Sequence, residues 1–328
     1  MAQGLAPLRV GAVEDGTACG YYRIRLPFEE LSKHGHEMKH ARDYSEIGDS
    51  WPTLVTERFG APGFEVQWLK LWRNHKIVWE TDDDLWNIDS PNKRAVKAFT
   101  PDFLRAMEMC VRTAHLVTVT NDHLAEQMSR FNSNIAVVPN MIDAPLCDMP
   151  RPRRDEVTIG WAGGDSHSRD MRYLVTPLQK IVRSTSAQVH TIGADFLSTL
   201  RIPKDRYRHS GWETRLIDYY RTIDFDIGLA PIEDTLFTRS KSYIKALEYG
   251  ALGIPVIASN AGPYREYVED GVTGFLVKKE SEWIDRLQLL IEDADLREKM
   301  GAAGREKARK HTIQAGWKQW ETVYRSLT

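Results

Sequence analysis

The sequence has little cysteine, no long apolar run and almost no net charge. Its three cysteines are odd in number and widely spaced, which fits neither a disulfide framework nor a zinc knuckle and favours a reducing cytoplasm. No apolar run approaches the roughly 20 residues of a membrane-spanning helix, and we expect no signal peptide or transmembrane segment. The net charge is -2, so composition gives no support for a nucleic-acid acceptor.

What the sequence does contain is a repeated alternation of short apolar runs with amphipathic stretches. A chain of 328 residues is long for one core, so two domains are expected. Buried strands that alternate with helices are typical of a parallel α/β sheet. The expected strands cover residues 8–13, 76–80, 115–120, 135–140, 157–163, 188–193, 226–232, 255–259 and 273–277.

Two such α/β series flank a segment rich in proline and charge at 151–156. We therefore predict two Rossmann-like domains, one at 1–152 and a second at 153–310. These domains would face each other across a cleft, because ligands bind beyond the carboxyl ends of parallel strands. Residues 311–328 predict a helix whose apolar stripe would pack back on the first domain; the stripe is Ile313, Trp317, Trp320 and Tyr324.

The segment SKSYIKALEYG predicts a helix that begins near Ser240–Ser242. A helix N-terminus suits a diphosphate, and Lys241 or Lys245 would add a cation. Glu248 lies three residues after Lys245, hence on the same face, where it could accept hydrogen bonds from ribose hydroxyls. The alternative is a surface Lys–Glu pair on an ordinary helix, and spacing alone favours that alternative.

A glycine-containing turn follows the first expected strand of each series. In the second series Gly163 and Gly164 would let a phosphate or sugar approach the backbone, and His167 would donate a hydrogen bond to it. A helix-capping loop with an exposed histidine is the alternative. A helix expected to follow the strand at 115–120 would be capped by Asn121 or Thr120.

In the first series the turn places Gly20 and Tyr21 on the expected cleft, next to Arg23. We expect Arg23 to supply positive charge to an anionic ligand in that cleft. The alternative for Arg23 is a salt bridge on the first helix.

Three consecutive carboxylates, Asp82, Asp83 and Asp84, follow the expected strand at 76–80, with Trp86 beside them. An Asp-x-Asp pair can hold a divalent cation against a nucleotide diphosphate. Asp82 and Asp83 could instead bind acceptor hydroxyls, with the Trp86 ring stacked on a sugar. A capped, solvated loop with no ligand is the third possibility.

Several segments resemble, in order, the GT-B glycosyltransferases, especially glycosyltransferase family 4. They are FDIGLAPIEDTLFTRSKSYIK, LEYGALGIPVIAS, GPYREYVEDGVTGFLV and EWIDRLQLLIEDADLREKMGAAGREKARKH. The resemblance covers most of residues 157–310 and implies that the domain at 1–152 is on the acceptor side and that the domain at 153–310 binds the nucleotide sugar. It makes Glu248 the ribose-binding carboxylate. The family has a glutamate at the position of Ser240, so this chain departs from the pattern close to the donor sugar.

The resemblance implies a glycosyltransferase that retains anomeric configuration and needs neither a metal nor another cofactor. The donor would be a UDP- or GDP-linked sugar, and the acceptor a glycan, lipid-linked sugar, protein or small molecule. Arg23, Lys241 and Lys245 would stabilise charge on the leaving diphosphate, with Gly163, Gly164, His167, Ser240, Ser242 and Glu248 around the donor. The resemblance also implies that Asp82–Asp84 form an acceptor loop. It places Gly20 and Tyr21 near the acceptor and Arg23 near the donor phosphate. A nucleotide-sugar epimerase and a non-catalytic nucleotide-sugar-binding protein remain as alternatives.

Overall fold

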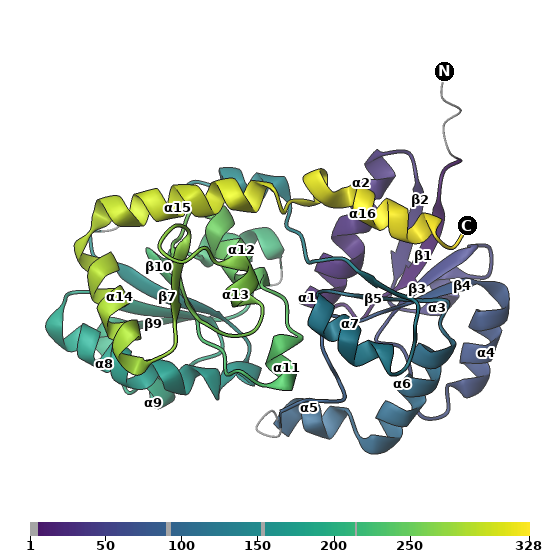
Figure 1. Cartoon of the computed structure of the whole chain (residues 1–328), viewed down its shortest axis with the longest axis horizontal. Coiled ribbons are helices and arrows are strands. Elements are labelled where there is room, and N and C mark those ends of the chain that lie inside the picture. The colour runs from purple at the N-terminus through teal and green to yellow at the C-terminus, as the bar shows by residue number, and fades with distance from the viewer. Residues whose placement is uncertain (1–5, 90–92, 152–154, 214) are drawn as a thin grey trace. The chain divides into compact units, whose positions relative to one another are not determined.

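The structure, a computed structural model, describes residues 6–89, 93–151, 155–213 and 215–328. It divides into two compact units, each an α/β sandwich (Figure 1). The first contains residues up to Asp143, Arg239–Ser242 and Thr312–Thr328, and the second contains Ala144–Thr238 and Tyr243–His311. The central residues of the expected linker, 152–154, lie outside the described residues.

The first unit is built on a six-stranded parallel sheet in the order β2-β1-β3-β4-β5-β6. The strands are β1 Arg9–Val13, β2 Glu37–Ala41, β3 Thr53–Glu57, β4 Lys76–Glu80, β5 Leu116–Val119 and β6 Ile135–Val137. The strand order reverses between β1 and β3, which makes the carboxyl edge there the expected ligand crevice. The sequence did not predict β2, whose edge position leaves most of its polar side chains exposed, or the short strand β3.

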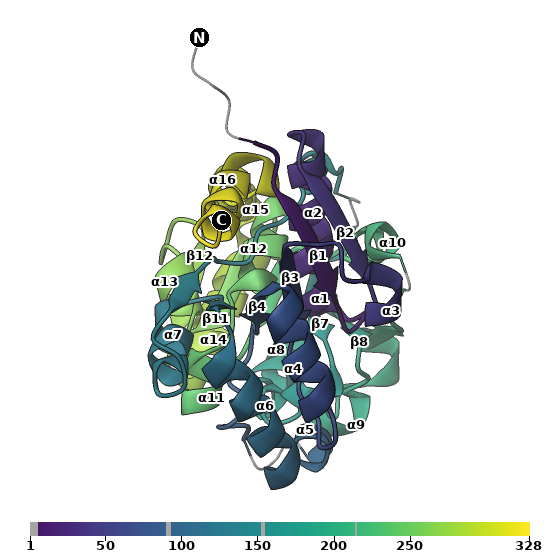
Figure 2. The ribbon, with the colours of Figure 1, turned by 90° about the vertical axis from the view of Figure 1, so that its right-hand side faces the viewer.

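Helices cover both faces of this sheet (Figures 1 and 2). They are α1 Ala18–Gly20, the π-helix η1 Tyr21–Arg25, α2 Leu26–Lys33, α3 Tyr44–Ile47, α4 Glu65–Asn74, α5 Lys93–Ala98, α6 Pro101–Thr113, α7 Asp122–Ser129 and α16 Ile313–Arg325. One core joins α4, α6 and α7 to the sheet, and a second joins α2 and α16 to its other face. Asn121 caps α7 by accepting a hydrogen bond from Leu124 N, as the sequence predicted.

The C-terminal helix α16 packs on the first unit, as its apolar stripe predicted. Ile313, Trp320 and Tyr324 are at most 1% exposed and lie in the same core as Leu31. The Trp317 ring stacks on His34 with 3.8 Å between the ring centroids. This burial gives α16 its stability, because a 13-residue helix is marginal in water without a packed face.

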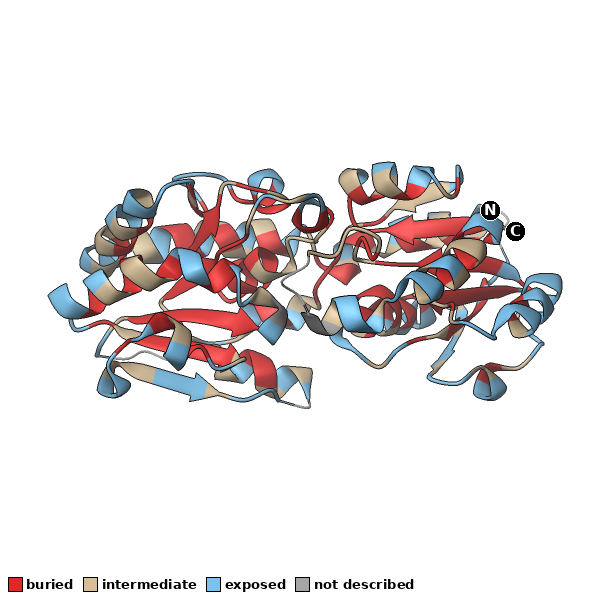
Figure 3. Cartoon of the chain, turned by 90° about the horizontal axis from the view of Figure 1, so that it is seen from below, coloured by how far each residue is buried: buried red, intermediate tan, exposed pale blue. Residues whose placement is uncertain are grey.

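The second unit contains a parallel sheet in the order β12-β11-β10-β7-β8-β9. Its strands are β7 Thr158–Gly163, β8 Gln188–Gly193, β9 Tyr207–Ser210, β10 Ile227–Ala230, β11 Val256–Ser259 and β12 Gly274–Val277. The order reverses between β7 and β10, as in dinucleotide-binding folds. The central strands are buried in both units (Figure 3), whereas the edge strand β9, which the sequence did not predict, is half exposed.

The helices of the second unit are α8 Val175–Ser184, α9 Leu197–Leu200, α10 Leu216–Thr222, α12 Ile244–Ala251, α13 Tyr264–Tyr267, α14 Glu280–Glu292 and α15 Ala294–Arg309, and α11 Leu236–Arg239 ends in the first unit. Short 3-10 segments are η2 Ala144–Asp148, η3 Asp165–His167, η4 Asp170–Leu174 and η5 Lys204–Arg206. Pro177 lies in the first turn of α8, where its missing N–H does no harm. Among the described residues, no helix has the length and apolar character to cross a bilayer.

The second unit begins at Ala144, nine residues before the expected start at 153. The reason is visible at Arg151, whose guanidinium donates to the carbonyl oxygens of Gly253 and Phe225 and to Asp226, all in the second unit. The final segment of the first unit begins at Thr312, where Ile313 N donates to Ile142 O at 2.8 Å.

Candidate functional site

The side-chain arrangement that best fits an anionic ligand lies in the second unit, where α12 approaches the carboxyl end of β7. The Lys245 ammonium group donates to Ala162 O and lies 4.8 Å from the centroid of the Trp161 ring. Gly163 ends β7, and a Cβ atom built on it would lie 3.1 Å from Lys245 Nζ. This places a cation and a bare backbone together beside the reversal between β7 and β10, which is where an anionic ligand is expected.

Glu248 lies on the same helix face as Lys245 and is only 5% exposed. The Tyr219 hydroxyl, from α10, donates to Glu248 Oε2 at 3.4 Å. Burial, and then the neighbouring carboxylate, raises the pKa of Tyr219 well above its usual value, so this phenol stays protonated and remains a donor. Tyr249 fixes the helix to the sheet by accepting a hydrogen bond from Ala162 N at 3.0 Å.

The glycine turn after β7 also forms an ordered anchor. His167 Nδ1 lies 2.8 Å from Asp170 Oδ2, and its ring packs edge-on against Trp161. Asp170 also accepts a hydrogen bond from Glu233 N through its other oxygen. His167 is therefore oriented by Asp170, at the end of the loop that starts with Gly163 and Gly164.

The sequence misplaced the start of α12, which begins at Ile244 rather than at Ser240–Ser242. The preceding residues belong to the first unit and are held there by its side chains. Lys241 Nζ forms an ion pair with Asp83 Oδ1 at 3.1 Å, and Ser242 Oγ accepts a hydrogen bond from Asn140 Nδ2 at 3.0 Å. Ser240 is fully buried, so its side chain is not presented to a ligand.

The expected phosphate-binding role of Arg23 is not supported, because this residue is completely buried. The π-helix η1 directs its side chain into the core of the first unit, where it stacks 4.8 Å from the centroid of the Trp320 ring. The five N–H donors of its guanidinium are matched by five acceptors: two carboxylate oxygens of Glu80, the carbonyl oxygens of Val119 and Val138, and Asn140 Oδ1. Arg23 is a structural cation that joins three strands.

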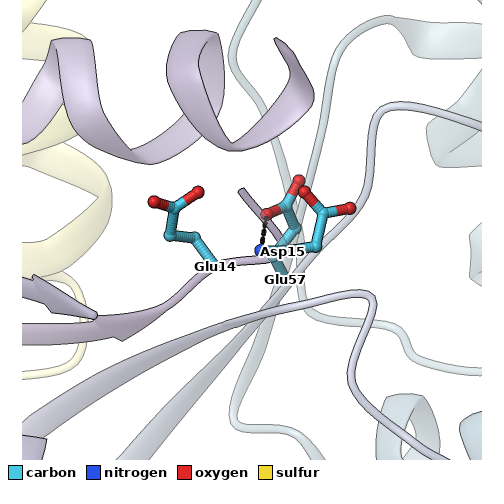
Figure 4. Close-up of side chains that lie close together, drawn as sticks. All are labelled: Glu14, Asp15 and Glu57. Carbon is cyan, nitrogen blue, oxygen red and sulfur yellow. Dashed lines mark hydrogen bonds between the residues drawn. The ribbon is translucent and has the colours of Figure 1, made fainter. Parts of the chain in front are cut away.

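The turn after β1 contains an acidic group that the sequence reasoning missed. Glu14, Asp15 and Glu57 bring carboxylate oxygens within 4.8 Å of one another (Figure 4). Arg58 Nη2 pairs with Asp15 Oδ2 at 2.9 Å and lies 3.4 Å from Glu57 Oε1. Arg25 Nε lies 3.6 Å from Glu14. The sequence did not indicate Glu57 and Arg58, because Glu57 ends β3, which was not predicted, and Arg58 follows it.

Gly20 and Tyr21 lie beside this acidic turn. Gly20 is helical, and a Cβ atom built on it would lie 2.2 Å from Glu14 Oε2, so any other residue there would displace the Glu14 carboxylate. Tyr21 is half buried, with the Arg25 guanidinium 5.6 Å from its ring centroid.

Burial, and then repulsion from Asp15, raises the pKa of Glu57 to about 7.

The aspartates after β4 have separate surroundings. Asp83 pairs with Lys241, whereas Asp84 is fully buried and closes its own loop by accepting hydrogen bonds from Trp86 N and Asn87 Nδ2. The Trp86 ring packs 4.6 Å from the centroid of the Phe131 ring, in the core cluster of the first unit. Its expected use as an open stacking surface for an acceptor is therefore not supported.

Comparison with known sequences matches this chain to glycosyltransferases over the segment that contains α12. Residues 244–307 match the family described as glycosyl transferases group 1. The D-inositol 3-phosphate glycosyltransferase of Paenarthrobacter aurescens (strain TC1) is 40% identical over 80 residues, which are 24% of this chain and 19% of that protein. That of Corynebacterium diphtheriae is 38% identical over 81 residues. The chain thus spans about a fifth of the length of these relatives.

Comparison with solved structures extends over almost the whole chain. Sucrose-phosphate synthase from Thermosynechococcus elongatus superposes with a TM-score of 0.72 at 16% identity, covering 98% of this chain and 99% of that one. HepE of Anabaena, in complex with UDP and glucose, gives a TM-score of 0.67 at 14% identity, covering 97% and 99%. The chain therefore has the GT-B glycosyltransferase fold, and it resembles family 4 in the segment that forms α12.

Proposed function

We propose that the protein transfers a glycosyl group from a nucleoside-diphosphate sugar to an acceptor hydroxyl. The proposal rests on the placement of Lys245 and Glu248 on one face of α12, beside the carboxyl end of β7, where Gly163 leaves the backbone without a side chain. A diphosphate at the start of α12 would meet the helix N–H groups and the Lys245 ammonium. The ribose hydroxyls would donate to Glu248, whose burial strengthens such hydrogen bonds.

The reaction requires stabilisation of the negative charge that develops on the leaving diphosphate. Lys245 lies at the place where that charge would form, and the amino end of α12 adds a partial positive charge. Lys241 lies in the segment before α12 and forms an ion pair with Asp83, so we propose that it contributes less than Lys245 to stabilising the leaving diphosphate. No step in this scheme uses a metal ion, and we propose retention of anomeric configuration, in line with the family 4 resemblance.

The first unit would bind the acceptor at its carboxyl edge. The acidic turn, defined as Glu14, Asp15 and Glu57, supplies acceptors for sugar or polyol hydroxyls, and Asp82 follows the neighbouring strand β4. The acceptor class stays open among glycans, lipid-linked sugars, proteins and small molecules. UDP and GDP are the first donor nucleotides to test, since the HepE neighbour was solved with UDP.

The departure at Ser240 bears on the alternative of a nucleotide-sugar-binding protein without activity. A buried serine cannot replace the carboxylate that the family pattern has near the donor sugar. Release of nucleotide in the presence of an acceptor would separate a transferase from such a binding protein. An epimerase would change the donor without any acceptor, and no structural observation favours it.

Substitution of Glu248 tests the proposal directly. Nucleotide at about 100 times its Kd should stabilise the wild-type protein by about 2.7 kcal/mol, visible as a rise in Tm. Glu248→Gln keeps the side-chain volume but replaces the carboxylate, so we expect it to remove most of the rise produced by UDP or GDP. Glu266→Gln, at an exposed position on α13 of the same unit, is the matched control and should keep the full rise.

The proposal is contradicted if Glu248→Gln binds both nucleotides as tightly as the wild type does. A nucleotide-induced rise that disappears with EDTA and returns with Mn²⁺ would contradict the metal-independent scheme while leaving the donor site intact.

A further inference from the structure

Residues Arg239–Ser242, which are separated from α12 by Tyr243, belong to the first unit although the chain on both sides of them belongs to the second. Each of three successive strands of the first sheet ends in a side chain that holds this segment. Asp83 follows β4 and pairs with Lys241, while Asn121 follows β5 and Asn140 follows β6. Side chains from three strand ends on four consecutive residues form a clamp, and we use that word for Asp83, Asn121 and Asn140.

Asn121 is the centre of the clamp. Its Nδ2 donates to the carbonyl oxygens of Arg239 at 3.2 Å and of Lys241 at 2.9 Å. Its Oδ1 simultaneously caps α7 by accepting from Leu124 N at 2.8 Å. The side chain is rigidly placed, because the residue is only 8% exposed and both ends of its amide are engaged. Two backbone carbonyls of the segment are thus fixed by one immobile amide.

Asn140 connects the clamp to the buried Arg23 network. Its Oδ1 accepts from Arg23 Nη1 at 3.1 Å, and its Nδ2 donates to Ser242 Oγ at 3.0 Å. Asn140 is 3% exposed and so cannot turn toward solvent. A continuous chain of hydrogen bonds therefore runs from the Glu80–Arg23 ion pair to Ser242, two residues before the first residue of α12.

We propose that Asn121 and Asn140 are positioning residues that fix the start of α12 for donor binding. The inference rests on the proposed function, because it concerns the place where the diphosphate would lie. The segment Arg239–Ser242 leads covalently into α12, so its carbonyl geometry sets the entry of the chain into the helix. Two asparagines of the first unit would thus control nucleotide affinity through the backbone, without touching the nucleotide.

The chain offers a matched control for Asn121 in Asn132. Asn132 has the same bonding pattern in the same unit: its Nδ2 donates to the carbonyl oxygens of Val111 and Ala114, and its Oδ1 accepts from Asn134 N. It is 9% exposed, against 8% for Asn121, but it holds the end of α6 rather than the segment before α12. Replacing either asparagine by aspartate keeps the acceptor and removes both donors.

The experiment measures the Kd of UDP, GDP and ADP by calorimetry, together with Tm, for Asn121→Asp and Asn132→Asp. Both variants should lose some stability, because a carboxylate would face two carbonyl oxygens. We expect Asn121→Asp alone to raise the Kd of the bound nucleotide by about tenfold, which corresponds to a loss of about 1.4 kcal/mol of binding free energy. Asn140→Ala removes the acceptor for Arg23 and the donor to Ser242 Oγ, so it should also raise the Kd. Asn140→Asp keeps an acceptor for Arg23 and can accept from the Ser242 hydroxyl, so it should restore the Kd toward the wild-type value, and equal Kd values for these two variants would contradict the role of Asn140.

Equal Kd values for Asn121→Asp and Asn132→Asp would overturn the inference, whether both were unchanged or both were raised. The Glu248→Gln variant separates this failure from that of the proposed function. If Glu248→Gln weakens nucleotide binding and Asn121→Asp does not, only the positioning role is wrong. If Glu248→Gln has no effect, the donor site itself is wrong, and the positioning role falls with it.

Discussion

The two units have the same kind of edge with opposite chemistry. In each, a glycine turn follows the first strand at the point where the strand order reverses. The turn after β1 contains the acidic turn, Glu14, Asp15 and Glu57, and arginines already neutralise part of its charge. The turn after β7 has bare glycine backbone and the Lys245 ammonium.

This difference agrees with the proposed binding of the donor by the second unit and of the acceptor by the first. A diphosphate is repelled by a concentration of carboxylates and attracted by an ammonium group beside a helix N-terminus. Hydroxyl groups, in contrast, donate readily to carboxylates. Under the proposed function, the same fold would serve as a donor site in one unit and an acceptor site in the other because the side chains after the first strands differ.

The two units also differ in the expected role of a cation: Arg23 stabilises the fold of the first unit, whereas Lys245 is proposed to bind the diphosphate in the second. We expect Arg23→Met to lower the free energy of unfolding by about 3–5 kcal/mol, because it leaves the Glu80 carboxylate buried without its partner. Urea unfolding measures this loss. Arg9→Met is the control: Arg9 forms an exposed ion pair with Glu37, and its loss should change stability by about 0–1 kcal/mol.

A folded Arg23→Met protein of normal stability that failed to bind nucleotide would reverse the comparison. It would mean that Arg23 serves the donor phosphate after all, as the sequence predicted, and that the five acceptors around it are dispensable.

Lys245→Met should show the opposite behaviour. If the ammonium stabilises the leaving diphosphate, its removal should lower kcat by about 10²–10³-fold, the usual effect of losing one such donor. Stability should change little in comparison, because Lys245 is half buried and the methionine can pack on Trp161. The measurement is steady-state release of the nucleotide, with the exposed Lys180→Met on α8 as control. An unchanged kcat in Lys245→Met would remove the cation from the proposed mechanism.

Much of the fold could be predicted because its signals are local. Strands such as β4 and β8 are short apolar runs, and the stripe of α16 has helical spacing. Two of the three missed strands, β2 and β9, lie at sheet edges, where half-exposed positions tolerate polar residues and the apolar signal disappears. The third, β3, is central and buried, but three of its five residues are Thr53, Thr56 and Glu57, which weakens its apolar signal. The cap of α7 by Asn121 was predicted because a cap depends only on the next three residues.

The site was harder to predict because partners distant in sequence determine it. A basic residue after a glycine turn indicates a phosphate ligand, yet Arg23 is buried against Glu80, 57 residues away. The spacing of Lys245 and Glu248 was predictable from the helix, but Tyr219 was not, since it approaches from α10. Nothing local indicates that Asn121 holds carbonyls 118 and 120 residues further along the chain.

The smallest expected effect tests whether the acidic turn is as crowded as its geometry indicates. Burial, and then the nearby Asp15, raises the pKa of Glu57 to about 7 in the folded protein. Between about pH 4.5 and 7 the folded state therefore binds a proton that the unfolded state has lost, and stability must fall as the pH rises through this range. The loss should be at most about 3 kcal/mol.

Glu57→Gln should abolish this part of the pH dependence and make the protein more stable than the wild type at pH 8. Its side-chain oxygen can still accept from Asp15 N, which donates to Glu57 at 2.8 Å. Urea unfolding at pH 5, 6, 7 and 8 checks the slope, with the exposed Glu46→Gln as control. If both variants keep the wild-type slope, Arg58 neutralises Glu57 more completely than its 3.4 Å approach indicates, and the contrast in charge between the two turns is smaller than we infer.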